Sequence, residues 1–162
     1  MLTIRKAEPR DATLVLAFIR ELADYEKLAH EVAASEADIA AALFSEQPRV
    51  FCDIAEWDGE PAGFALWFYN FSTFRGLHGI YLEDLYVRPA HRGRGLGKAL
   101  LAYLASRCVR EGLGRLDWAV LDWNAPSIAF YQGLGAQAQD DWTGYRLSDK
   151  ALLDLAKLVS TN

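Results

Sequence analysis

The spacing of apolar residues changes along the chain between a period of two and a helical period, and it predicts the order of the elements. Alternation over residues 2–6 indicates a strand, and helical spacing over about 9–28 and 35–44 indicates two helices. Ser35 and Asp38 stand three residues apart at the start of the second helix, the spacing of a capping box. The chain therefore begins with one strand and two helices.

Two aromatic-rich runs follow, over residues 50–57 and 62–71, and both have the composition of strands. The dipeptide Asp58-Gly59 between them is a strong hairpin signal, because both residues tolerate a positive φ. Glu60 and Pro61 stand between this dipeptide and the second run, so we expect them to lengthen the loop.

The second half of the chain alternates strands and helices. We expect a strand over 80–87, a helix over 95–111, a buried strand over 116–121, a short helix over 126–132, part of a last strand over 145–148, a C-terminal helix over 149–159 and frayed residues at 160–162. This order predicts an α/β fold of the α+β type, in which helices cover a mixed sheet.

Composition favours one folded domain over residues 1–162. The chain is 52% hydrophobic and 24% charged, which is typical of a globular protein, and no apolar run approaches the roughly 20 residues of a membrane span. The N-terminus lacks the apolar region of a secretion signal, which favours a cytoplasmic location. The formal charge of -5 argues against nucleic-acid binding and suits a cationic small substrate.

Cysteine and histidine give no sign of a metal centre. Cys52 and Cys108 are widely spaced and belong to no Cys-x-x-Cys pair, so we expect reduced thiols in the core. His30, His78 and His91 share no ligand spacing. The sequence therefore predicts no metal site.

A glycine-rich loop follows the strand at 80–87. Gly93, Gly95 and Gly97 can adopt backbone conformations closed to other residues and let an anion approach the main chain, and the next helix begins with unpaired N–H groups. Cations are spaced through the same stretch, at Arg88, Arg92, Arg94 and Lys98. These features predict a site for the diphosphate of a nucleotide-bearing cofactor.

Two common phosphate-binding motifs do not fit this loop. A Walker loop requires glycine where Arg92 stands and Ser or Thr where Ala99 stands, and the dinucleotide fingerprint requires a third glycine where Lys98 stands. The pattern Arg-x-x-Gly-x-Gly, from Arg92 to Gly97, resembles the acetyl-CoA loop of the GNAT superfamily of N-acetyltransferases, in which the loop amides hold the CoA pyrophosphate. A glycine-rich turn that only opens a helix is the structural alternative.

A second signature begins at Asn124. The run Asn-x-Pro-Ser-x-x-x-Tyr, followed by Gly-Ala, resembles the second GNAT signature, in which the tyrosine hydroxyl lies beside the CoA sulfur. A departing thiolate requires a proton, and the Tyr131 phenol can supply it. The alternative is a packing tyrosine, a role that Phe130 could share. Asn124 has the position of a helix cap, and the resemblance also assigns it, with Pro126 and Ser127, to the CoA site.

Glu83 and Asp84 stand in an apolar run, where ionised carboxylates are unfavourable unless they face a cavity, a partner or a cation. Neighbouring strand residues point to opposite faces, so we expect one to face the acceptor and the other to make structural hydrogen bonds. We assign Glu83 to the acceptor ammonium, whose proton it would remove directly or through water. The alternative is that both carboxylates only cap buried polar groups.

The resemblance to GNAT enzymes covers nearly the whole chain and is closest to the diamine branch, the spermidine/spermine and thialysine N-acetyltransferases. It is carried by residues 20–26, 71–75, 81–84 and 119–124. It implies a mainly antiparallel sheet, acetyl-CoA as co-substrate and a cytoplasmic homodimer. Residues 76–79 form a longer segment than in relatives, and Phe74 replaces their usual tryptophan, so the acceptor stays open.

Carried over by position, the resemblance assigns the site residues to three groups and names Tyr131 as the general acid. The acceptor amine would be bound by Tyr25, Glu26, Glu83 and Asp84. The pantetheine would pair with the backbone of Leu85, Tyr86 and Val87. The pyrophosphate would be held by Arg92, Gly93, Arg94, Gly95, Leu96, Gly97 and Lys98.

The sequence thus predicts an acetyl-CoA-dependent N-acetyltransferase that acts on the primary amine of a small diamine, polyamine or thialysine-like compound. No cysteine lies at either signature, so we expect direct transfer in a ternary complex. Two alternatives stay open: acetylation of a protein N-terminus or lysine, and a non-catalytic acyl-CoA-binding sensor. The acceptor stays open among polyamines, thialysine, lysine analogues, aminoalkyl compounds and antibiotics.

Overall fold

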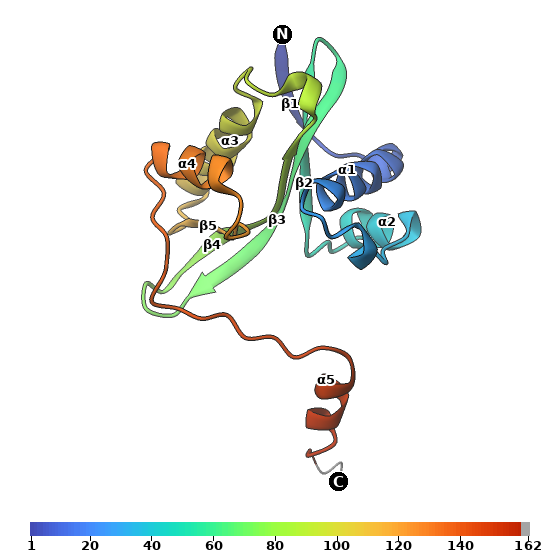
Figure 1. Cartoon of the computed structure of the whole chain (residues 1–162), viewed down its shortest axis with the longest axis vertical. Coiled ribbons are helices and arrows are strands. Elements are labelled where there is room, and N and C mark those ends of the chain that lie inside the picture. Colours follow the sequence, from blue (N-terminus) through green and yellow to red (C-terminus); the bar gives the residue numbers. More distant parts are fainter. Residues whose placement is uncertain (160–162) are drawn as a thin grey trace. The chain divides into compact units, whose positions relative to one another are not determined.

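One mixed sheet is formed by five strands within the described residues, 1–159, in the order β1-β2-β3-β4-β5 (Figure 1). In the computed structural model the strands are β1 (Leu2–Lys6), β2 (Phe51–Trp57), β3 (Glu60–Ser72), β4 (Leu77–Val87) and β5 (Leu116–Trp118). The first four are antiparallel, and β5 runs parallel to β4. The predicted α+β fold with a mixed, mainly antiparallel sheet is therefore confirmed.

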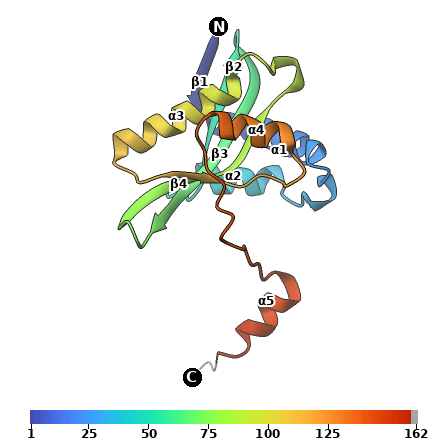
Figure 2. The same ribbon diagram turned by 60° about the vertical axis from the view of Figure 1, so that its left-hand side comes forward.

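Helices cover both faces of this sheet (Figures 1 and 2). The helices α1 (Ala12–Tyr25) and α2 (Glu36–Phe44) lie on one face, and α3 (Leu96–Glu111) lies on the other. A short 3-10 turn, Pro9–Asp11, comes directly before α1. Another, Pro89–His91, lies between β4 and the glycine loop that leads into α3.

Local signals account for the helix boundaries. The Ser35 hydroxyl accepts a hydrogen bond from the Asp38 N–H at 3.2 Å, and the Asp38 carboxylate accepts one from the Ser35 N–H at 2.8 Å, which completes the predicted capping box. Gly112, at a φ of 67°, ends α3 as predicted. The first helix ends at Tyr25, earlier than predicted, because Lys27 takes a left-handed φ of 61°.

A hydrophobic core lies between the sheet and the helices α1 and α2. Phe18 stacks on Phe64 with ring centroids 5.2 Å apart, and Tyr86 meets Phe18 edge-on at 6.4 Å. The buried members of this core are Ala7, Val15, Phe18, Leu43, Cys52, Ile54, Phe64, Leu66 and Tyr86. Burial of this apolar surface holds α1, and the residues at its end, against β3 and β4.

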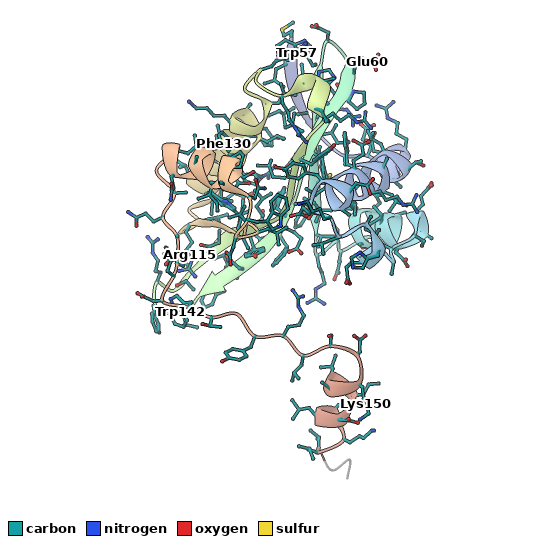
Figure 3. All side chains as sticks on the ribbon, in the orientation of Figure 1. Trp57, Glu60, Arg115, Phe130, Trp142 and Lys150 are labelled. Carbon is teal, nitrogen blue, oxygen red and sulfur yellow. The ribbon has the colours of Figure 1, made fainter. Side chains whose placement is uncertain are left out.

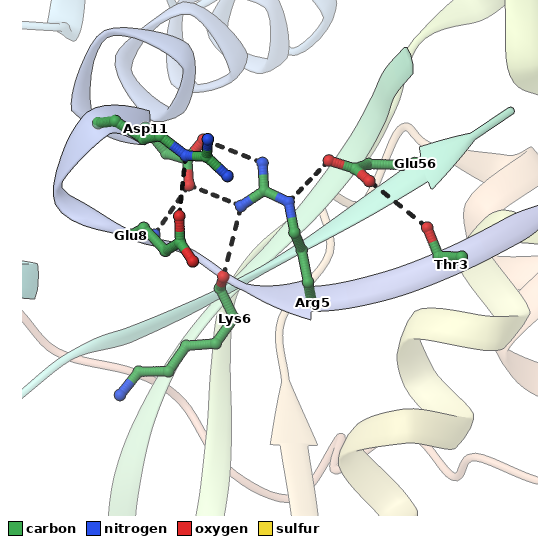
Figure 4. A network of polar contacts seen from close by, with 7 residues as sticks. Thr3, Arg5, Lys6, Glu8, Asp11 and Glu56 are labelled. Atoms are coloured by element: carbon green, nitrogen blue, oxygen red, sulfur yellow. Dashed lines mark hydrogen bonds and ion pairs between the residues drawn. The ribbon is translucent and has the colours of Figure 1, made fainter. Parts of the chain in front are cut away.

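The start of α1 is fixed by ion pairs around Arg5 (Figure 4). The Arg5 guanidinium donates two hydrogen bonds to Asp11, at 2.7 and 3.0 Å, and a third to Glu56, at 2.7 Å. Asp11 is only 5% exposed, and its hydrogen bonds with Arg5 hold the pKa of its carboxyl below the usual value. The network joins β1 and β2 to the first turn of α1.

The hairpin between β2 and β3 is tighter than predicted. Asp58 and Gly59 form the whole turn, and Trp57 pairs directly with Glu60 at the end of the sheet (Figure 3). The expected lengthening of the loop is wrong, because Glu60 and Pro61 already belong to β3. A bulge after Pro61 accommodates this residue, whose missing N–H cannot join a regular ladder.

The described residues after Leu121 belong to a second compact unit, distinct from the unit of residues 1–121. Its described part contains α4 (Ala125–Gly133) and α5 (Asp149–Ala156). Both helices were expected, although α5 is shorter than predicted. A single domain over the whole chain stays a prediction.

Two strand predictions differ from the structure. The strand at 145–148 is wrong: these residues have no regular structure, and the described part of their unit offers no strand to accept their hydrogen bonds. The strand predicted at 116–121 was expected to be buried, but it covers only Leu116–Trp118 and is half-buried. The expected fraying of 160–162 lies outside the described residues. None of the helices described within residues 1–159 is both long and apolar enough to cross a membrane.

Candidate active site

The predicted anion-binding loop lies between β4 and α3. Gly93 and Gly95 have left-handed φ angles of 76° and 83°, conformations that glycine adopts without strain. Nothing lies within 4 Å of the point where a Cβ would stand on either residue, so the space beside the loop is open. Gly97 differs from the prediction: it is the second residue of α3 and needs no left-handed conformation.

The backbone N–H groups of residues 93–98 donate to no backbone carbonyl within the described chain. Hydrogen bonds on either side run from the Arg92 N–H to Pro89 and from the Ala99 N–H to Gly95. A run of unpaired donors at the positive end of a helix is the arrangement that binds phosphate groups. The loop therefore fits the predicted diphosphate.

The cations predicted for this loop have different partners. Arg88 is neutralised by Glu21 of α1, because its Nη2 donates to Oε1 at 2.8 Å and its Nε to Oε2 at 3.1 Å. The Arg94 guanidinium lies over the Trp57 ring, 5.1 Å from the centroid. Lys98 is exposed in the first turn of α3. The expectation that Arg88 adds charge to the anion site is therefore not met.

The edge of β4 beyond Leu82 is open on one side. The pairing with β5 runs only from Ile80 to Leu82, whereas the pairing with β3 continues to Val87. Within residues 1–159 no strand neighbours the other edge of this last part of β4. An extended ligand with amide groups can pair with such an edge, the task predicted for residues 85–87.

A β-bulge interrupts β4 at Glu83. Leu66 is opposite Asp84 and Trp67 is opposite Leu82, which leaves Glu83 as an extra residue. The strict alternation expected for the two carboxylates does not apply, because a bulge breaks the two-residue repeat. Asp84 shares the face of Leu66, which belongs to the core beneath α1, whereas Glu83 is exposed.

Asp84 is a half-buried carboxylate without a counter-ion. Residues 1–159 give neither Asp84 nor Glu83 a hydrogen-bond or ion-pair partner, so the expected structural hydrogen bonds are not found. Burial, with the charges of Glu83 and Glu26, raises the pKa of Asp84 to about 6. Burial also raises the pKa of Glu26. We call Glu26, Glu83 and Asp84 the acid cluster, because the charges of the two glutamates both act on the Asp84 carboxyl group.

Two of the residues predicted to bind the acceptor lie at the end of α1. Tyr25 is the last residue of α1, and Glu26 is its C-cap, whose N–H still bonds the Leu22 carbonyl at 2.9 Å. Lys27 then turns the chain in the left-handed region, which costs a non-glycine residue about 1 kcal/mol. Strain of this kind often marks a functional site.

The hairpin between β3 and β4 contains Phe74 and residues 76–79, where the chain differs from the diamine branch. Phe74, at its tip, is 95% exposed, so it packs against no part of its unit. Gly79 is required by packing, because a Cβ there would stand 2.7 Å from the Arg115 carbonyl oxygen. Of the unusual segment, Gly76 lies in the turn between the two strands, and residues 77–79 form the start of β4.

The second signature lies on α4, in the second unit. Asn124 caps this helix, because its side-chain oxygen accepts the Ser127 N–H at 3.3 Å, and Pro126 stands in the first turn. The capping prediction is confirmed. Tyr131 lies in the last turn, with its ring centroid 5.5 Å from that of Phe130.

The cysteines behave as predicted. Cys52 and Cys108 are buried free thiols, and burial raises the pKa of both. No group of three or more His, Cys, Asp or Glu residues within 1–159 is arranged to hold a metal ion.

Sequence reasoning overlooked another carboxylate in an apolar strand. Asp53, in β2, is 2% exposed, and its Oδ2 accepts a hydrogen bond from the Trp67 Nε1 at 2.8 Å. Burial raises the pKa of Asp53. An acid within an apolar run, the signal that singles out Glu83, also singles out Asp53, but Asp53 has a hydrogen-bond partner inside the fold.

The sequence of residues 16–136 matches the model of the Acetyltransferase (GNAT) family, and the chain belongs to this family. It is therefore an N-acetyltransferase of the EC 2.3.1 type. Membership implies the use of acetyl-CoA, which agrees with the open amides of the loop.

The chain is similar to the thialysine N-epsilon-acetyltransferase of Bos taurus, with 38% identity over 164 residues that cover 94% of this chain and 96% of the relative. It is 30% identical to the L-ornithine N5-acetyltransferase NATA1 of Arabidopsis thaliana over 200 residues, covering 96% and 88% of the two chains. A solved structure, the integron cassette protein VCH_CASS6 from the mobile metagenome of V.cholerae, superimposes with a TM-score of 0.79 at 31% identity, covering 96% and 98%.

Proposed function

We propose that the protein acetylates the primary amine of a small compound with two ammonium groups, such as a diamine, a polyamine or thialysine. The acid cluster carries this proposal. Its three carboxylates include one, Asp84, whose charge the described residues do not neutralise. A bound dication would supply the missing counter-charge. The similarity to acetyltransferases of thialysine and ornithine supports this class of acceptor.

The first unit would hold most of the cofactor. The unpaired amides of residues 93–98, with Arg92, would bind the pyrophosphate, and the open backbone edge at 85–87 would bind the pantetheine. Acetyl-CoA supplies the acetyl thioester. The resemblance assigns further contacts to the second unit, at Asn124, Pro126 and Ser127.

Three proton transfers complete the reaction. Glu83, at the bulge, would take the first proton from the acceptor ammonium, directly or through water, while Asp84 and Glu26 bind positive charge. The neutral amine would then attack the thioester carbonyl, and the carbon–sulfur bond would break as the Tyr131 hydroxyl donates a proton to the departing sulfur. The second proton, which the nitrogen loses as the amide forms, would return through water to the Tyr131 phenolate. Direct transfer suits this chain, since Cys52 and Cys108 are buried thiols and neither belongs to either signature in the sequence.

Thiol release from acetyl-CoA across a panel of acceptors tests the proposal. The panel contains thialysine, ornithine, lysine, diamines, polyamines and short peptides. We expect turnover with a small dication, and we expect Tyr131→Phe and Glu83→Gln each to lower kcat about 100-fold. Turnover confined to peptides would support a protein acetyltransferase instead. CoA binding without turnover of any acceptor would support an acyl-CoA sensor.

We also propose that the protein is a cytoplasmic homodimer. The resemblance implies this state, and α5 supports it, because its second unit does not bury Leu152, Leu153 or Leu155. Sedimentation equilibrium of the full chain would give a mass twice that of the monomer, and a monomer at micromolar concentration would contradict the proposal.

A further inference from the structure

Two arginines of the connection between β4 and α3 contact α1. The Arg88 guanidinium donates to both carboxylate oxygens of Glu21 and lies 4.6 Å from the ring centroid of Phe18. The Arg92 guanidinium lies 5.0 Å from the ring centroid of Tyr25. These contacts tie the segment that leads into the phosphate-binding loop to a single helix.

The contacted residues share one face of that helix. Phe18, Glu21 and Tyr25 are spaced three and four residues apart, so they lie on the same side of α1. Glu26, a member of the acid cluster, follows Tyr25 directly. The connection between β4 and α3 therefore holds the turn of α1 that delivers Glu26 to the amine site.

Arg92 is itself fixed in place. Its Nε donates to the Val87 carbonyl at 2.9 Å, and its guanidinium lies 5.6 Å from the ring centroid of Tyr86. A guanidinium over an aromatic face is attracted by the ring quadrupole. The next residue, Gly93, begins the run of unpaired amides. A change in the position of that loop would therefore be passed to Tyr25 through one side chain.

We propose that Arg92 is a positioning residue that couples the phosphate-binding loop to the amine site through Tyr25. Occupancy of the loop fixes Arg92, and Arg92 in turn holds Tyr25 and Glu26 for the acceptor. This inference rests on the proposed function, and it adds a role to a residue that the resemblance assigns only to the pyrophosphate. Such coupling is reciprocal, so a bound acceptor also strengthens cofactor binding.

Hydrogen–deuterium exchange with CoA as the probe tests the coupling without an acceptor. In the wild-type protein, CoA is expected to slow exchange both at the loop, residues 93–98, and at the end of α1, residues 22–28. Arg92→Gln should bind CoA more weakly, because Arg92 also contacts the pyrophosphate, so each protein is compared at a CoA concentration that saturates it. Under that condition Arg92→Gln should keep the protection of the loop, which the backbone amides provide, and lose that of α1. Arg94→Gln is the matched control, because it removes the same charge from the same loop but contacts Trp57 instead of α1.

Variants of Tyr25 keep the test valid if Arg92→Gln folds poorly. Tyr25→Leu removes the ring and should abolish the protection of residues 22–28, whereas Tyr25→Phe keeps the ring and should retain it. Equal protection of α1 in Arg92→Gln and the wild-type protein would overturn the coupling. Absence of loop protection in the wild-type protein would overturn the proposed cofactor site as well, so the two failures are distinguishable.

Steady-state kinetics give a second readout once an acceptor is known. Arg92→Gln should raise the KM for acetyl-CoA, because Arg92 also binds the pyrophosphate, and at saturating acetyl-CoA it should raise the KM for the amine about tenfold, a larger change than that in kcat. Arg94→Gln should raise the KM for acetyl-CoA and leave the KM for the amine unchanged. An amine KM unaffected by Arg92→Gln would contradict the proposed role.

Discussion

Asp11 and Asp84 are two aspartates beside the same helix, and their environments are opposite. Asp11, at the start of α1, accepts two hydrogen bonds from Arg5, and its pKa lies below the usual value. Asp84, on β4, is coupled to Glu26 at the other end of α1, and its pKa is raised to about 6. Among residues 1–159, the first carboxylate has a counter-ion and the second has none.

This difference distinguishes a structural acid, Asp11, from the acid that we propose binds the acceptor, Asp84. A buried carboxylate with a fixed guanidinium stabilises the folded state, and removal of either partner leaves an uncompensated charge. A carboxylate surrounded by other acids weakens the fold until a cation arrives. The uncompensated charge of Asp84 thus lowers folding stability at the proposed amine site, as is common at functional sites.

Asp11→Ala should produce the largest change, a loss of about 3 kcal/mol in the free energy of unfolding, because it leaves Arg5 without its main partner. Urea unfolding at pH 7 measures it. The pKa of Asp11 is lowered on folding, so its contribution is present above about pH 4 and is lost as pH falls through the folded value. A loss below about 1 kcal/mol would place the pair among ordinary surface ion pairs.

Asp84→Asn should have the opposite sign and raise the free energy of unfolding by about 2 kcal/mol at pH 8. The pKa of Asp84 is raised on folding to about 6, so the wild-type protein loses stability as pH rises from about 4 to about 6. The difference in free energy of unfolding between the variant and the wild-type protein should therefore grow as pH rises from about 4 to about 6 and disappear below about pH 4. Unfolding curves from pH 4 to pH 8 test this, and a destabilised variant would contradict it.

Binding of a diamine should release protons near pH 6. Half of the free protein carries a proton on Asp84 at its pKa, and a bound ammonium lowers that pKa. We expect about half a proton released at pH 6 and almost none at pH 8. Titration calorimetry in two buffers of different ionisation enthalpy measures the release. Asp84→Asn is the control, and release that persists in this variant would assign it to another group.

Arg5→Lys should produce the smallest change, a loss of about 1 kcal/mol in the free energy of unfolding. Lysine keeps the charge but cannot donate to Asp11 and Glu56 in the forked geometry of the guanidinium. Thermal unfolding beside Asp11→Ala measures it. A loss as large as that of Asp11→Ala would show that geometry, and not charge, carries the network.

The sequence predicts those parts of the site that depend on local chemistry. Gly93 and Gly95 were identified because left-handed backbone favours glycine, and Asn124 because a helix cap requires an acceptor side chain. Glu83 and Asp84 were identified because acids are unusual in apolar runs. Each of these signals lies within a few residues along the chain.

Features that depend on distant contacts could not be predicted. The bulge at Glu83 follows from the register between β3 and β4, and Arg88 pairs with Glu21, which is 67 positions away in sequence. The strand expected at 145–148 failed for a related reason, since a strand pattern does not reveal whether a partner strand exists. Local periodicity thus gave the elements, and tertiary pairing decided how the carboxylates are used.

The most direct test of the acid cluster compares acetylation of a diamine with that of the matching monoamine, which lacks one ammonium group. The account predicts that kcat/KM favours the diamine roughly tenfold or more, the effect of one charge-assisted contact, and that Glu26→Gln and Asp84→Asn remove most of this preference. Asp24→Asn, an exposed acid two positions before Glu26, should leave it intact. Equal kcat/KM values for the two amines in the wild-type protein would contradict the account.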